Sequence, residues 1–286
     1  MKFIFGNECV YTTKGNYPNG KMVVPERIDA IANDGEIFEN VTDLDLANVK
    51  VVKGDCFNGW QNLSNVKFPS TLEIIGEGSF QDCGLEDISI DAKCVIGMNA
   101  FRDNKSLKKV VLFNSELIGG CAFADCNKLQ EVKLIDVDTV KLSAFYFCER
   151  LCNLSFINSA KHITNVDAED IVLNEKDMTW SVYNQQLYKL LKNLNNDSIM
   201  NLIEVCPKVC LAISSERCTE KFLKEAHESI VRGMTQRAEK CHYDEKVTRK
   251  DIALLPYLKA WEEQECSKHT APAAKFKAAI DEFNKK

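Results

Sequence analysis

No apolar run in this 286-residue chain approaches the roughly 18 to 20 residues that a membrane-spanning helix needs. The first ten residues, MKFIFGNECV, hold only three consecutive apolar residues before Gly6 and do not have the pattern of a secretory signal. We therefore expect no membrane partner and a cytoplasmic location. Secretion or display at the cell surface is the alternative if the sequence is incomplete at its N-terminus.

The residues that usually carry catalysis are also scarce. The chain has four histidines, and it contains no phosphate-binding glycine loop, no nucleophile elbow and no paired-carboxylate motif. Cys206 and Cys210 enclose Pro-Lys-Val, which is the wrong spacing for a Cys-x-x-Cys redox or zinc pair. We expect no enzyme, no cofactor and no metal, with two alternatives left open: an accidental Cys/His catalytic pair and a zinc cluster of Cys218, His227, Cys241 and His242.

Charge limits the partners and suggests a division of the chain. The formal net charge of −6 is mild and has the wrong sign for a nucleic-acid binder, so we expect no nucleic-acid partner. Residues 1–174 hold 17 Lys and Arg against 25 Asp and Glu, whereas residues 175–286 hold 19 against 17. This difference in character predicts two domains.

Cysteine, in contrast, is abundant. Thirteen is an odd number, so disulfides within one chain cannot use every cysteine. In the absence of an export signal, the count favours reduced thiols in a reducing compartment.

Phenylalanine recurs at a nearly fixed interval in the first half of the chain. The anchors return about every 22 residues, and each is followed by Leu-x-x-Val-x-Leu or a close variant. A pair of aliphatic residues and a glycine precede several anchors. One such coil cannot bury its apolar residues alone, so successive coils must stack. With two degenerate copies upstream, the array predicts a solenoid of six to seven coils over residues 22–168, with anchors at Phe57, Phe80, Phe101, Phe123 and Phe145.

The recurring phrases Cys-x-x-Leu-x-x-Val-x-Leu, at residues 126–134, and Ile-Gly-x-x-Ala-Phe, at residues 96–101, resemble the BspA-type leucine-rich repeat. The resemblance implies a right-handed solenoid with a parallel sheet on its concave side, used for binding rather than catalysis. Members of that family are often described as secreted or surface adhesins. Independently, the Val-x-Leu spacing places two side chains on one face of a short strand. We also expect Gly76, Gly97 and Gly119 to occupy tight turns that need a positive φ.

Three cysteines stand at one position of the repeat. Cys83, Cys126 and Cys148 occupy the third position after an anchor, and Trp60 and Asn104 take that position in other coils. A position that accepts Cys, Trp and Asn is not a metal-ligand position. It predicts a buried ladder in which cysteine acts as a small hydrophobic residue.

The residues between the buried ones on each short strand point outward and form three columns along the array. One column alternates in charge through Asp87, Lys109 and Glu131, as expected of cross-strand pairs that support a sheet. Another column is apolar over several coils, on a face that water normally covers. Contiguous exposed apolar surface usually marks a contact, either with a partner or with the chain's own C-terminal half. The predicted partner-binding residues are Lys67, Ser89, Asp91, Lys109, Val111, Phe113, Glu131, Lys133, Ile135, Asn153, Ser155 and Ile157.

Helical spacing replaces the anchors in the C-terminal half. Residues 180–194 place a row of leucines on one face, and a shorter helix at residues 198–206 follows, capped by Asp197 or Ser198. Thr219 begins a third helix, residues 248–261 form a fourth, and residues 273–286 form a last one. Residues 169–286 are therefore predicted to form an all-α helical bundle.

These expectations combine into an α+β protein of two domains. A leucine-rich repeat solenoid with short parallel strands, at residues 22–168, follows an N-terminal cap segment at residues 1–21 and precedes the helical bundle at residues 169–286. The predicted function is non-catalytic binding of a protein partner through the concave face, with the bundle as a cap, a second contact or a site of self-association. The alternatives are that the helical domain carries an effector or enzymatic activity which the solenoid targets, or that the protein is a surface adhesin.

Overall fold

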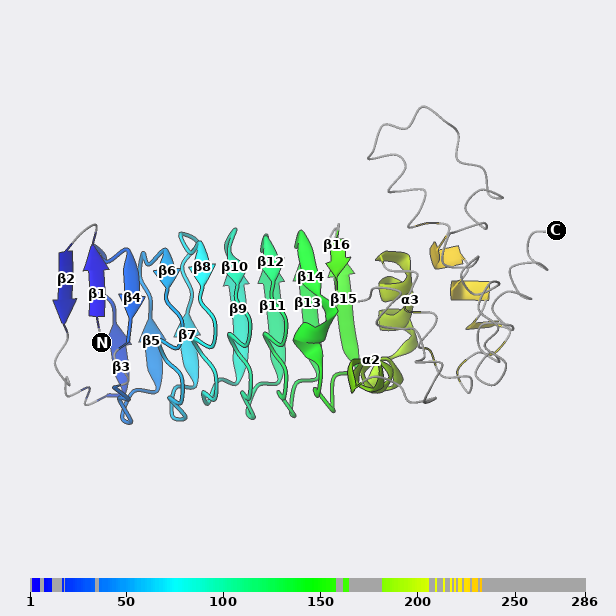
Figure 1. Ribbon diagram of the computed structural model, residues 1–286, viewed down its shortest axis with the longest axis horizontal. Coiled ribbons are helices and arrows are strands. Elements are labelled where there is room, and N and C mark those ends of the chain that lie inside the picture. The colour runs from blue at the N-terminus through cyan, green and yellow to red at the C-terminus, as the bar shows by residue number, and fades with distance from the viewer. Residues whose placement is uncertain are drawn as a thin grey trace, which may run out of the picture. The chain divides into compact units, whose positions relative to one another are not determined.

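The computed structural model describes residues 2–5, 8–11, 17, 19–33, 36–157, 162–164 and 182–205, and short stretches between 209 and 232. The chain divides into two compact units, Met1–Asn165 and Val166–Lys286. In the first unit, strands lie side by side along the whole length, each successive coil beside the one before (Figure 1).

Each coil of the first unit contributes two strands. The first strands of the coils form two parallel sheets, one of three strands and one of four. We call the four-stranded sheet the strand platform. The three-stranded sheet consists of β3 (Lys21–Val23), β5 (Asp43–Asp45) and β7 (Asn65–Lys67), and the strand platform consists of β9 (Asp87–Asp91), β11 (Lys109–Phe113), β13 (Glu131–Ile135) and β15 (Asn153–Ile157).

The second strands build a nine-stranded sheet that begins with an antiparallel pair. β1 pairs antiparallel with both β2 and β4, and all later pairs in this sheet are parallel. Its members are β1 (Lys2–Phe5), β2 (Glu8–Tyr11), β4 (Ala30–Ala32), β6 (Val51–Val52), β8 (Ile74–Ile75), β10 (Val95–Ile96), β12 (Leu117–Ile118), β14 (Thr139–Lys141) and β16 (His162–Thr164).

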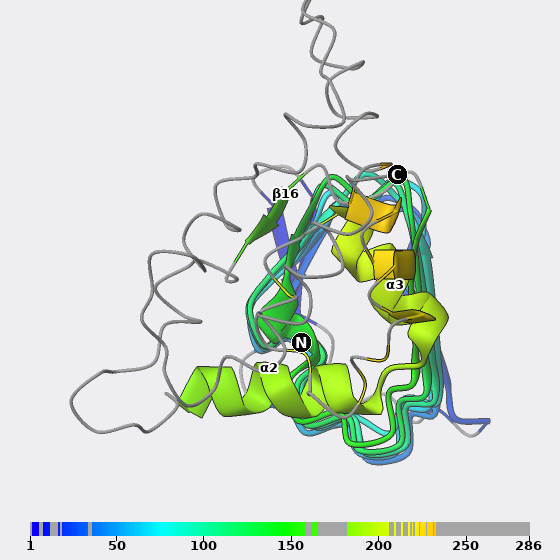
Figure 2. The same cartoon turned by 90° about the vertical axis from the view of Figure 1, so that its right-hand side faces the viewer.

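The predicted parallel solenoid is confirmed. Along the platform, each residue pairs with its counterpart in the next coil, as Lys109 pairs with Glu131. Seen along the array, successive coils follow almost the same path (Figure 2). Each coil also contributes a second strand to the nine-stranded sheet, whereas the sequence predicted a parallel sheet on the platform side only. In one coil, a 3₁₀ turn, η1 (Leu142–Phe145), takes the place of an irregular turn.

The anchor phenylalanines form one stacked column in the core. Ring centroids of successive anchors lie 4.9 Å apart for Phe57 and Phe80, then 5.3, 5.2 and 5.8 Å along the column, with interplanar angles of 18° or less. All five rings are buried. Such stacked aromatic pairs contribute about 0.5–1.5 kcal/mol each beyond their area burial. The column therefore holds neighbouring coils in register through side chains as well as backbone, with its rings at Phe57, Phe80, Phe101, Phe123 and Phe145.

The cysteine position is a ladder of buried donors. Cys83, Cys126 and Cys148 are buried, and the Sγ of each donates to the carbonyl oxygen of the preceding coil's anchor at 3.1 to 3.3 Å. Asn104 makes the same contact through Nδ2, at 2.8 Å from the Phe80 oxygen. The predicted structural role is confirmed, and the shared donor explains why asparagine can replace cysteine there. Burial raises the pKa of the Cys83 and Cys148 thiols to about 12.

The reason given above for the recurring glycines is wrong. Gly76, Gly97 and Gly119 do not have positive φ. Instead, a Cβ on Gly97 would lie 2.8 to 3.0 Å from backbone atoms of Ile75, Gly76 and Glu77 in the preceding coil. Glycine is required because adjacent coils approach closely at this point. The left-handed turns are taken largely by Asp and Asn, the residues that tolerate them best after glycine, as at Asp103 and Asp125.

Two helices of the second unit are described. α2 (Val182–Asn193) and α3 (Asn196–Val205) agree with two of the predicted helices. The cap of α3 differs from the expectation, because Asn195 Oδ1 accepts from the Ser198 N–H at 2.8 Å. Arg217 donates to the Leu191 and Lys192 carbonyl oxygens at the end of α2, which satisfies groups that a helix end leaves open.

The rest of the predicted bundle is not shown. Helical residues occur between 221 and 232, and Thr219 Oγ1 accepts from the Phe222 N–H at 3.2 Å, as a capping threonine does. The predicted helices at residues 248–261 and 273–286 lie outside the described residues. The five-helix bundle therefore remains a prediction.

We predict that Gly97→Ala destabilises the solenoid, whereas Gly120→Ala does not. The added Cβ at Gly97 meets backbone, which must shift, and such overpacking costs about 1–3 kcal/mol. At Gly120 the nearest atoms are Ser143 Oγ at 3.4 Å and Lys141 Cδ at 3.8 Å, so a methyl group has room. The midpoint of urea unfolding, followed by circular dichroism, should fall for the first variant only. Equal midpoints would contradict the close-approach explanation.

We predict that Cys83, Cys126 and Cys148 resist alkylation in the folded protein. Their burial and raised pKa leave almost no thiolate at pH 8, and only the thiolate is the nucleophile. Cys152 is partly exposed and should react with N-ethylmaleimide under the same conditions. Peptide mass spectrometry would locate the label before and after unfolding. Labelling of Cys126 as fast as Cys152 would show that the ladder opens in the native state.

Candidate protein-binding surface

The strand platform presents a regular outward face. Burial alternates along its strands, so that the residues at positions 1, 3 and 5 of β9, β11, β13 and β15 lie outward and those between are buried. Because the strands pair without slippage, outward residues of successive coils stand in three straight columns. The columns are those expected from the sequence.

Eleven of the twelve predicted site residues lie on this platform. Lys67 is the exception, because β7 belongs to the three-stranded sheet with β3 and β5. The division between the two sheets falls between β7 and β9, although Asn65 and Asp87 are 22 residues apart, the same step as from Asp87 to Lys109. The structure therefore brings together Ser89, Asp91, Lys109, Val111, Phe113, Glu131, Lys133, Ile135, Asn153, Ser155 and Ile157.

The third column is apolar over three strands. Phe113 pairs with Ile135, which pairs with Ile157. The first two are half-buried by their neighbours, and Ile157 exposes 46% of its surface. Val111, in the middle column beside Phe113, extends this apolar area.

Charged residues beside the apolar column hold one another in place. Glu131 Oε1 lies 2.9 Å from Lys133 Nζ, and its other oxygen lies 3.5 Å from Lys109 Nζ. The hydrogen bond from Lys133 outweighs partial desolvation and, with the positive charge of Lys109, keeps the pKa of the Glu131 carboxyl below its ordinary value. Exposed pairs of this kind contribute little to stability, but they fix the positions of three long side chains.

The other end of the array has an acidic character that the columns predicted from the sequence did not include. Asp43 and Asp45 of β5 take the corresponding outward positions in the three-stranded sheet, in register with Asn65 and Lys67. Burial opposes ionisation of Asp45, but the Ala47 N–H and the Lys67 ammonium, 3.0 Å away, hold the pKa of its carboxyl below the ordinary value. The signal was present in the sequence, since Leu44-x-Leu46 has the same period-2 spacing as the later strands.

Metal binding and membrane insertion find no support in the described part of the chain. Among the described residues, no three His, Cys, Asp or Glu side chains come close enough to hold a metal ion. The candidate zinc residues Cys218, His227, Cys241 and His242 lie outside the described residues, as do Cys206 and Cys210. Within the described segments, no helix has the length and apolar character to span a bilayer.

Solved structures similar to this chain are leucine-rich repeat proteins and an antigen. A T. pallidum leucine-rich repeat protein, TpLRR, is 24% identical over 54% of this chain and 73% of its own, with a TM-score of 0.45. A leucine-rich repeat protein from Bacteroides ovatus is 19% identical over 50% of this chain and 56% of its own, with a TM-score of 0.31. The pneumococcal vaccine antigen PcpA is 17% identical over 50% and 58%, with a TM-score of 0.23. No curated protein matches the chain.

The family comparison agrees with the repeat geometry. A model described as the BspA type leucine rich repeat region matches residues 36–152 and 95–168, in six copies. These residues include the whole strand platform and the phenylalanine column. Residues 36–168 are therefore a BspA-type leucine-rich repeat region.

Proposed function

We propose that the chain is a non-catalytic protein-binding protein that holds its partner on the outward face of the strand platform. The observation that carries this proposal is the apolar column Phe113, Ile135 and Ile157, which lies on the solvent side of a sheet whose other side is already fully packed. Neighbouring exposed aromatic and aliphatic residues are the kind of surface that protein partners cover.

The platform supplies rigidity as well as apolar area. Each of its strands is paired over five residues, and the rows beneath are buried core. The ion pairs of Glu131 with Lys109 and Lys133 restrain the long side chains next to the apolar column. A surface that is ordered before binding loses little entropy on association, which favours affinity.

The arrangement of side chains also indicates the chemistry of the partner. The apolar column accepts aliphatic or aromatic side chains, and the acids at the β9 and β5 end, Asp91, Asp87, Asp43 and Asp45, attract cationic ones. The partner segment we propose is therefore apolar at one end and basic at the other. The predicted site residues Ser89, Asn153 and Ser155 would supply hydrogen bonds around these contacts.

Location decides between two forms of this function. We infer a reducing compartment such as the cytoplasm, because Cys83, Cys126 and Cys148 act as buried hydrogen-bond donors, a role that needs the reduced thiol. If the protein instead reaches the cell surface, the same platform would make it an adhesin, a role consistent with the repeat family. An effector activity of the helical unit, and self-association through that unit, remain further proposals.

We predict that the triple variant Phe113→Ala, Ile135→Ala, Ile157→Ala loses the partner. Truncating an apolar cluster that a partner covers costs about 2 kcal/mol or more, which corresponds to roughly a thirtyfold weaker complex. Wild-type and variant chains would be used as baits under one set of conditions, and captured proteins quantified by mass spectrometry. An amine-reactive crosslinker should join the captured partner to Lys109 and Lys133, which flank the column.

The matched control is Val23→Ala, which removes an exposed aliphatic side chain from β3, outside the platform. It should leave both capture and crosslinks unchanged. The proposal fails if the triple variant, folded by circular dichroism, captures the same proteins at the same level. It also fails if the crosslinks of the captured partner map away from the platform.

A further inference from the structure

A second apolar surface lies on the nine-stranded sheet. Val51, Ile74, Val95 and Leu117 are the first residues of β6, β8, β10 and β12, and they pair in register from coil to coil. Each is half-buried or exposed, while the next residue of each strand is fully buried. We call these four side chains the aliphatic stripe. At about 4.8 Å per strand, the stripe is about 14 Å long.

The stripe departs from the pattern that the fold requires. A strand with one face in the core and the other in water normally alternates apolar and polar residues. In four successive coils the outward position is aliphatic instead, and Ile74 exposes 44% of its surface. Glycine stands two positions after three of these residues, at Gly76, Gly97 and Gly119, so no side chain rises there to shield the stripe. Met98, which directly follows Gly97, is 50% exposed and adds apolar surface next to these glycines.

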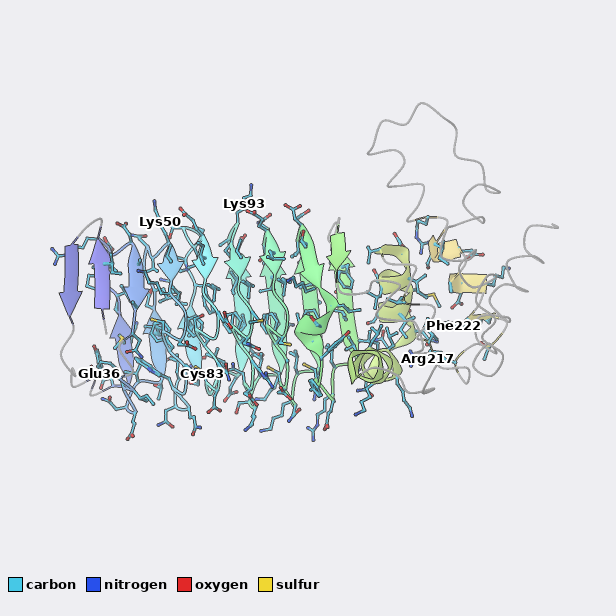
Figure 3. The ribbon with its side chains drawn as sticks, viewed as in Figure 1. Glu36, Lys50, Cys83, Lys93, Arg217 and Phe222 are labelled. Carbon is cyan, nitrogen blue, oxygen red and sulfur yellow. The ribbon has the colours of Figure 1, made fainter. Side chains whose placement is uncertain are left out.

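Charges border the stripe at the edge where its strands begin. Lys50 precedes β6, Glu73 precedes β8, Lys93 stands just before Cys94 and β10, and Glu116 precedes β12. All four are exposed. Figure 3 shows Lys50 and Lys93 at the same edge of the molecule. The register counterpart of Lys50, Glu73 and Glu116 in the coil of β10 is the buried Cys94, so that coil's charge comes from Lys93, one residue earlier. With Lys93 in that place, the signs along this edge run positive, negative, positive, negative over the four coils of the stripe.

This order of charges is complementary to itself when reversed. Two copies that pack face to face about a two-fold axis parallel to the strands run in opposite directions along the array. The first coil of the stripe then faces the fourth of the other copy, and the second faces the third. Lys50 meets Glu116, and Glu73 meets Lys93, and the two-fold symmetry makes each contact twice. An order of two positive residues followed by two negative ones would allow the same pairing, but a row of one sign would forbid it.

We propose that the aliphatic stripe is a self-association surface, on which a second copy of this chain packs antiparallel. The stripes exclude water from each other, and the edge charges select the antiparallel orientation. This surface differs from the strand platform, so the inference does not depend on the proposed partner. Four side chains and four charges form a contact below the usual size of about 800 Å² per partner, so a dissociation constant on the order of 10 µM is expected.

The first test is sedimentation velocity of the full-length chain over a concentration series that spans the micromolar range. Wild type should pass from monomer to dimer. Ile74→Lys places two cations within the symmetric contact and should raise the dissociation constant about tenfold or more. Val23→Lys, at a side chain that is 54% exposed on the three-stranded sheet, is the matched control and should dimerise like wild type. Circular dichroism confirms that both variants fold.

A charge exchange tests the orientation. Glu73→Lys alone sets two lysines against each other in each contact, and Lys93→Glu alone sets two glutamates against each other, so each should weaken the dimer. The double variant restores opposite signs and should recover most of the wild-type affinity. Glu73 also forms an ion pair with Lys50 of the same copy, at 3.9 Å between exposed side chains. Such a pair contributes little, so its loss in the Glu73 variants does not explain changes in dimer affinity.

Three results would overturn the proposal. The first is a wild-type chain that stays monomeric throughout the series. The second is an Ile74→Lys variant that dimerises as well as wild type. The third is a double variant that dimerises no more tightly than the two single variants. If the platform triple variant abolishes the dimer while Ile74→Lys does not, the two copies meet on the platform and the stripe is not the contact. Loss of partner capture by the triple variant, in contrast, tests only the proposed function.

Discussion

The hydrogen bonds between successive coils are the constraint on which the rest of this molecule depends. Peptide groups of one coil bond to those of the next along both sides of the array, and also in the turns, as from the Phe101 N–H to the Ala122 carbonyl at 2.7 Å. This ladder sets the distance between coils to that of neighbouring strands. Wherever strands of successive coils pair, each side chain therefore faces its counterpart in the neighbouring coil, in the core and on the surface alike. The phenylalanine column, the cysteine ladder, the platform and the aliphatic stripe all follow from this one spacing.

The same spacing explains how much the sequence could predict. Once Phe57 to Phe145 establish the period, the core column and the three outward columns follow by counting, because a stacked array allows no freedom of register. The apolar column at Phe113 was foreseen in this way. The role of Gly97 was not, because the distance between two backbones is a property of stacked coils that local turn rules do not contain. The ion pairs of Glu131 likewise depend on side-chain conformations that spacing does not determine.

Two features of the surface were hidden by the repeat itself. The paired aliphatic residues, such as Ile74-Ile75, indicate a buried strand, and only the structure separates the outward member from the inward one. The strand step gives no sign of the division, because Asn65 of β7 lies 22 residues before Asp87 of β9, just as Asp87 lies 22 before Lys109, and counting therefore joined Lys67 to a sheet that it does not belong to. In the second unit no repeat links one helix to the next. The spacing of apolar residues placed α2, α3 and the helix that begins near Thr219, of which helical residues are described between 221 and 232.

The third position after four of the five anchors shows how such an array can change over time; the exception is Trp60, after Phe57, whose Nε1 makes no hydrogen bond. Its thiol or amide bonds to a carbonyl oxygen of the coil before it, and the contact is the same at Cys83, Asn104, Cys126 and Cys148. Each of these coils therefore supplies the donor for the bond to the coil before it, and its anchor carbonyl can accept from the coil after it. Duplicating or losing a whole repeat would leave no junction unmatched, while every outward column would gain or lose one residue. Length, and with it the reach of each surface, can thus vary by recombination without a new core.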